Sequence, residues 1–115
     1  MRISELQKLV YEEYKSNGYL DMWTSKNPPP KDYSEEQRIM DLAEVGLFNT
    51  EVSEMLEDVR VCGYPLILEK IGEESSDIII RVLNFASRKG VNVEDYILLK
   101  HEKNLKRGER HGKKI

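Results

Sequence analysis

Two long apolar patterns meet at a break, Gly63-Tyr64-Pro65, and this break limits the folds open to the chain. Before it, apolar residues recur with the three- and four-residue spacing of one buried helix face, at Ile39, Leu42, Ala43, Leu47, Phe48, Val52, Met55, Leu56 and Val59. After it, they continue at Ile71, Ile78, Ile79, Ile80, Val82, Leu83, Phe85 and Ala86. Glycine readily ends a helix, and proline fits the first turn of the next one. The sequence therefore predicts an antiparallel helical hairpin.

Each side of the break carries a pair of acidic residues three positions apart. Glu51 and Glu54 come before it, and Glu74 and Asp77 come after it. Residues three apart share a helix face, so each pair presents two carboxylates together. At 1.5 Å of rise per residue, Glu54 lies about 12 Å from the turn and Glu74 about 14 Å, so the pairs reach matching heights. Converging carboxylates repel unless a cation lies between them, and Mg²⁺, or Mn²⁺ in its place, accepts such oxygen ligands.

The C-terminal stretch of the chain is basic. Residues 100–115 hold seven Lys and Arg residues against two acidic ones, a net charge of +5, whereas residues 1–99 carry −8. Such a tail usually indicates nucleic-acid binding or simple solvation. The acidic remainder and the lack of aromatic residues after Tyr96 argue against a nucleic-acid partner. Beside an acidic metal site, the tail can instead supply the positive charge that a polyphosphate requires.

The acidic motifs and the tail, taken together, resemble the MazG-type, all-α nucleotide pyrophosphohydrolases. The first pair reads ExxE, the second reads ExxD, and the tail reads K-x3-N-x2-R-x3-HGKK. The tail residues that carry the resemblance are Lys100, Asn104, Arg107, His111, Lys113 and Lys114. The resemblance extends from about Ser34 to Ile115, so we expect one MazG-like domain over residues 1–115.

The resemblance implies a hydrolase that cleaves a (deoxy)nucleoside triphosphate to the monophosphate and pyrophosphate. The metal ligands and catalytic residues would be Glu51, Glu54, Glu74 and Asp77. A cation held there neutralises phosphate charge and activates water. The basic side chains of the tail would hold phosphate oxygens, and Asn104 would add neutral hydrogen bonds. A phosphoribosyl-nucleotide pyrophosphohydrolase and a non-catalytic helical interaction module are the alternatives.

Four further residues are candidates or departures from the family pattern. Thr50 stands where many members carry a glutamate, and Asn84 stands where an acidic residue is common. The Asn84 amide can coordinate a cation or donate a hydrogen bond, but it adds no charge. Arg81 either pairs with a nearby carboxylate or contacts substrate. Trp23 either covers the core or stacks on a nucleobase.

Capping signals delimit four helices. Capping boxes at Ser4 and Ser34 open the first and second helices. The first helix should end near Asn17-Gly18, and Gly90 should end the third. Asn92 starts the fourth. The isoleucine run of the third helix favours a strand locally, but the helical period continues through it.

The third helix is apolar on nearly every side and needs neighbours on nearly every side. We therefore expect an all-α, four-helix bundle-like protomer that assembles as a homodimer or a dimer of dimers. The hydrophobic content of 39% and charged content of 34% fit one helical domain. No apolar run approaches the length of a membrane span. A single cysteine, Cys62, and the absence of a signal-peptide pattern favour a cytoplasmic protein.

Overall fold

The computed structural model describes residues 1–16 and 33–107, and every regular element in them is a helix. The helices are α1 (Ile3–Ser16), α2 (Glu35–Val61), α3 (Leu66–Arg88) and α4 (Val93–Arg107). Because these residues contain four helices and no strand, the all-α prediction is confirmed. Within the same residues, no helix combines the length and the apolar character that a membrane span requires.

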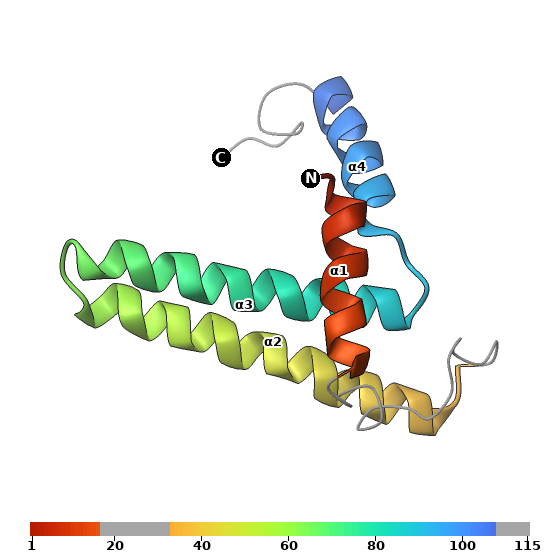
Figure 1. Ribbon diagram of the computed structural model, residues 1–115, viewed down its shortest axis with the longest axis horizontal. Helices are drawn as coiled ribbons and strands as arrows, with labels where there is room; N and C mark the ends of the chain where they lie inside the picture. The colour runs from red at the N-terminus through yellow and green to blue at the C-terminus, as the bar shows by residue number, and fades with distance from the viewer. Residues whose placement is uncertain (17–32, 108–115) are drawn as a thin grey trace.

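Helices α2 and α3 lie side by side and run in opposite directions (Figure 1). Helix α1 crosses and packs on α3, and α4 packs on the N-terminal part of α1, away from the α2–α3 pair (Figure 1). The chain makes this departure just after α3, where Gly90 adopts a φ of +73° that favours glycine. The protomer thus differs from the bundle-like arrangement that we expected, because α4 turns toward α1 instead of packing along α2 and α3.

Three of the predicted helix boundaries depend on contacts that the structure contains. The Ser34 hydroxyl accepts a hydrogen bond from the Gln37 backbone N–H at 3.1 Å, which caps α2. Gly90 follows α3 in the left-handed region, as a helix stop requires. The Asn92 side-chain oxygen accepts from the Asp95 backbone N–H at 3.4 Å, at the start of α4. These signals are local, which is why the sequence reveals them.

The predicted cap at Ser4 is wrong, because α1 already begins at Ile3 and Ser4 has another partner. Its backbone N–H donates to Glu94 at 3.2 Å, and Arg2 pairs with the same carboxylate at 2.7 Å. In return, Gln7 on α1 accepts from the backbone N–H of Val93, the first residue of α4, at 3.1 Å. Each of the two helices therefore caps the other, and these bonds fix α4 against α1.

Over residues 1–16 and 33–107, more polar side chains than apolar ones are fully buried. Among the described residues, the fully buried apolar side chains are Ile67 and Leu83. The buried polar or charged residues are Gln7, Gln37, Asp41, Glu44, Glu51, Asn84, Arg88 and Glu94. Much of the face predicted to be buried on the second helix is exposed in the single chain, at Ile39, Leu42, Val52, Leu56 and Val59. Further exposed apolar residues on α3 and α4 are Ile79, Ile80, Tyr96, Ile97 and Leu99. The expectation of a buried face holds only in part for the protomer: Phe48 of α2 meets Phe85 of α3 edge to face, but much of the remaining α2–α3 contact is made by charged residues.

Arg88 is the centre of the buried contact between α2 and α3. Its Nε and Nη2 atoms donate to Glu44 Oε1 at 3.0 and 2.7 Å, and Nη2 also donates to Asp41 at 2.7 Å. Burial alone would raise the pKa of Asp41, but hydrogen bonds from Lys89, Tyr33 and Arg88 outweigh it and lower the pKa. For Glu44 burial prevails, so its pKa lies above the ordinary value despite Arg88. The network therefore joins the two helices through charge.

Candidate metal centre

Three of the four predicted carboxylates converge between α2 and α3. Glu51 and Glu54 from α2 and Glu74 from α3 each offer an oxygen, and these oxygens lie within 4.8 Å of one another. Glu51 is buried, Glu74 is half-buried and Glu54 is exposed, so the group extends from the protein interior to solvent. We call these three residues the carboxylate cluster.

The cluster has an excess of negative charge. Burial raises the pKa of Glu74, and the neighbouring carboxylates of Glu54, Asp58, Glu51 and Asp77 raise it further. One oxygen of Glu74, Oε2, is buried and has no hydrogen-bond partner among the described residues. Crowded carboxylate oxygens, one of them buried without a donor, match the ligand preference of a hard divalent cation. The residues present therefore fit a Mg²⁺ or Mn²⁺ site.

Arg81 supplies the cation that is paired with the cluster in the described part of the chain. Its Nε donates to Glu51 Oε1 at 3.0 Å. The Glu51 side chain is 11% exposed, whereas that of Arg81 is 41% exposed. The sequence allowed two roles for Arg81, an ion pair with a nearby carboxylate or a contact with substrate. The structure contains the ion pair.

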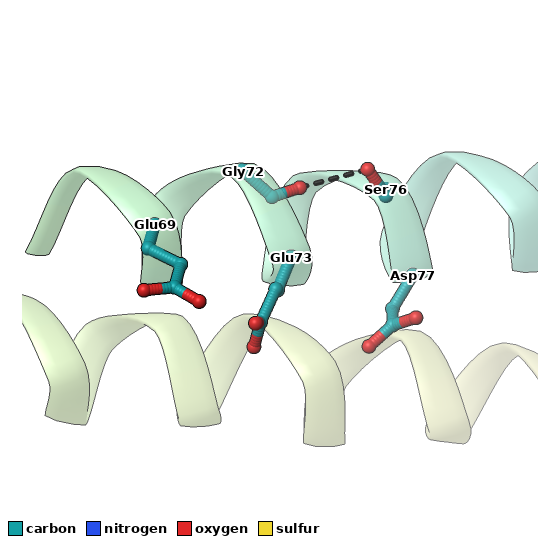
Figure 2. Close-up of a pocket in the computed structure, with 5 residues that line it drawn as sticks. All are labelled: Glu69, Gly72, Glu73, Ser76 and Asp77. Carbon is teal, nitrogen blue, oxygen red and sulfur yellow. Dashed lines mark hydrogen bonds between the residues drawn. The ribbon is translucent and has the colours of Figure 1, made fainter. Parts of the chain in front are cut away.

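Asp77, the predicted fourth ligand, lies outside the carboxylate cluster. It projects from α3 on the same side as Glu69 and Glu73, at four-residue intervals (Figure 2). These three acids line an open depression together with Gly72 and Ser76, where the Ser76 hydroxyl donates to the Gly72 carbonyl at 2.7 Å. Asp77 is still near enough to contribute to the raised pKa of Glu74. It is therefore a neighbour of the three-glutamate group.

Asp58 is a further acidic neighbour of the cluster that belongs to neither the ExxE nor the ExxD motif. It is half-buried and contributes to the raised pKa of Glu74. The signal was present in the sequence, since Asp58 lies four residues after Glu54 and thus one turn along the same face. The three-residue spacing of the ExxE and ExxD motifs does not include that position.

The predicted phosphate-binding residues of the tail that the structure describes do not meet the carboxylate cluster within one protomer. Lys100 and Arg107 are exposed on α4 and Asn104 is half-buried there, while α4 packs on α1 (Figure 1). Asn84 is buried on α3, and its Oδ1 has no hydrogen-bond partner among the described residues. The remaining predicted residues lie outside the described ranges: Trp23, His111, Lys113 and Lys114.

Comparison with known proteins finds no protein-family model, no curated protein and no solved structure that matches this chain. The main features of the site are three converging glutamates, a nearby arginine and an acidic depression on α3.

Proposed function

We propose that the chain is a MazG-type hydrolase that converts a (deoxy)nucleoside triphosphate to a nucleoside monophosphate and pyrophosphate. The observation that carries this proposal is the convergence of Glu51, Glu54 and Glu74 within 4.8 Å. Two helices bring acceptor groups together that repel one another in the absence of a cation. Mg²⁺ is the proposed metal and Mn²⁺ its substitute, because both accept carboxylate oxygens and leave coordination positions for phosphate.

The three glutamates would hold the cation, which when bound neutralises phosphate charge and activates water. In the proposed reaction, a water oxygen attacks the α-phosphorus and the bond to the α–β bridging oxygen breaks. Pyrophosphate leaves with the electron pair of that bond. In this proposal Asp77, outside the cluster but electrostatically coupled to Glu74, would accept the proton that the water loses.

Phosphate binding by Lys100, Asn104 and Arg107 requires more than one protomer, because α4 stands apart from the α2–α3 pair. We therefore include a homodimer or a dimer of dimers in the proposal. The exposed apolar faces of α2, α3 and α4 support it, since water-exposed faces of this extent favour association. In such an assembly, the basic face of α4 can serve the cluster of a second copy.

The test is an assay of pyrophosphate release with a panel of nucleoside and deoxynucleoside triphosphates and Mg²⁺. A phosphoribosyl-nucleotide belongs in the panel, because it is the alternative substrate class. Two variants, Glu54→Gln and Glu74→Gln, should lose metal-dependent activity. Glu57→Gln is the matched control, since Glu57 lies on the same helix but is exposed and pairs with Arg60. Full activity in both cluster variants would show that the site assignment is wrong.

A further inference from the structure

We propose that Arg81 is a built-in counterion of the carboxylate cluster, held on Glu51 in the metal-free protein and displaced toward substrate phosphate when the metal binds. This inference rests on the proposed function for the assignment of a divalent cation to the cluster. It adds a regulatory role for a residue of this chain that is not a metal ligand.

The way in which Arg81 is held supports a displaceable contact. Within the described residues, Arg81 contacts Glu51 through Nε alone, at 3.0 Å, and 41% of its side chain is exposed. Arg88, two turns further along α3, binds Glu44 and Asp41 with three hydrogen bonds and is 0% exposed. The buried arginine is locked in place, whereas the exposed one can turn into solvent without breaking a network.

A divalent cation and Arg81 would compete for the same carboxylate. Glu51 is one of the three residues whose oxygens converge, and its Oε1 accepts the arginine hydrogen bond. In the metal-free protein, Arg81 neutralises part of the negative charge of the carboxylate cluster through its ion pair with Glu51. A bound cation would take over that neutralisation and repel the guanidinium. Metal binding should therefore weaken the ion pair between Arg81 and Glu51.

A released Arg81 would remain next to the site. It lies four residues after Asp77, which is one helical turn along the side of α3 that carries the acidic depression. A guanidinium presents a planar set of donors that matches phosphate oxygens. The ligand class that fits both a cation on the cluster and a free arginine beside it is a metal-chelated polyphosphate. Binding of metal and nucleotide would then be coupled through one side chain.

The experiment titrates Mn²⁺ alone into the wild type and into Arg81→Met, followed by calorimetry, with folding checked by circular dichroism. Methionine keeps an unbranched apolar stem but removes the charge. Since a partly exposed ion pair contributes little, we expect Arg81→Met to bind Mn²⁺ about threefold more tightly or better. Arg60→Met is the matched control, because Arg60 pairs with Glu57 and should leave the Mn²⁺ affinity unchanged. A second titration, with a non-hydrolysable triphosphate and saturating Mn²⁺, should show weaker nucleotide binding in Arg81→Met.

The outcomes separate this inference from the proposed function. If the wild type binds Mn²⁺ and Arg81→Met binds it equally or more weakly, the counterion role is overturned while the metal site stands. If neither protein binds Mn²⁺, the metal site and the inference both fail. Binding by Arg81→Met but not by the wild type would support the counterion role in its strongest form.

Discussion

Arg88 donates two hydrogen bonds to Glu44 across the α2–α3 contact, and no part of the arginine side chain is exposed. Seven residues closer to the turn on each helix, Arg81 and Glu51 repeat the same pairing at 3.0 Å. A seven-residue step is close to two full helical turns, so both pairs lie along one line of contact. The Arg88–Glu44 pair is buried and structural, whereas the Arg81–Glu51 pair includes a residue of the carboxylate cluster.

The buried pair should dominate the stability of the protomer. Replacement of Arg88 by methionine would leave Asp41 and Glu44 buried without their main partner, at a cost of about 3–5 kcal/mol in unfolding free energy. Urea denaturation monitored by circular dichroism measures this cost. The control is Arg60→Met, which removes an exposed pair with Glu57 and should cost no more than about 1 kcal/mol. Equal effects of the two substitutions would contradict the structural role of Arg88.

Removal of one charge from the carboxylate cluster should move activity and stability in opposite directions. In Glu54→Gln, pyrophosphate release should collapse, while the melting temperature of the metal-free protein should stay equal or rise because repulsion falls. Mg²⁺ should raise the melting temperature of the wild type more than that of the variant, through linkage. A structural ion pair would behave differently, since its loss would lower activity and metal-free stability together.

The raised pKa of Glu74 predicts a pH dependence that Glu74→Gln should remove. Its pKa is raised in the folded protein, so the folded state binds the proton more tightly than the unfolded state does. Ionised Glu74 therefore destabilises the metal-free wild type at neutral pH, and the penalty disappears as pH falls through the raised pKa toward the ordinary glutamate pKa of 4.5. With EDTA present, Glu74→Gln should melt higher than the wild type at pH 8, and the difference should shrink toward pH 4.5. A constant difference over this range would contradict the shift.

The exposed apolar faces predict association in solution. Ile79 and Ile80 are 51% and 40% exposed on α3. Sedimentation velocity at micromolar concentration should reveal at least a dimer, and Ile80→Glu should shift the population to smaller species because a charge at an apolar interface is costly. Glu13→Gln, at an exposed polar position of α1, should leave the distribution unchanged. A monomer in the wild type would refute the proposed assembly.

Arg107, the last residue of α4, should contribute to nucleotide affinity and little to folding. Loss of a charge-assisted hydrogen bond in Arg107→Ala would weaken nucleotide binding by about 1.5–3 kcal/mol. The helical signal should persist, because Arg107 is exposed. The neighbouring Lys106 pairs with Glu102 on the surface, so Lys106→Ala serves as the control with a small expected effect. Unchanged KM and kcat in Arg107→Ala would contradict the proposed role of Arg107 in nucleotide binding and would indicate that this end of α4 is only solvated.

The helices and their ends were predictable from the sequence because they depend on neighbours along the chain. The caps at Ser34 and Asn92 and the stop at Gly90 each involve contacts or dihedral angles within a few residues. The acidic pairs were predictable for the same reason, since spacing alone places two carboxylates on one helix face. Ser4 shows the limit, because its partner Glu94 lies 90 residues away.

Which faces meet was decided only by the tertiary structure. Helical spacing places Asp77 and Glu74 on one face, yet the rotation of α3 against α2 admits Glu74 to the cluster and leaves Asp77 beside it. The same rotation brings Arg88 and Arg81 onto the glutamates of α2, while many apolar residues of both helices remain exposed. The rotation of a helix about its own axis is set by long-range packing and charge. The 3.6-residue period shows which residues share a face, but it does not specify which face meets the neighbouring helix. The sequence by itself therefore determined the helices and the candidate acids, and the packing of α2 against α3 determined which acids converge.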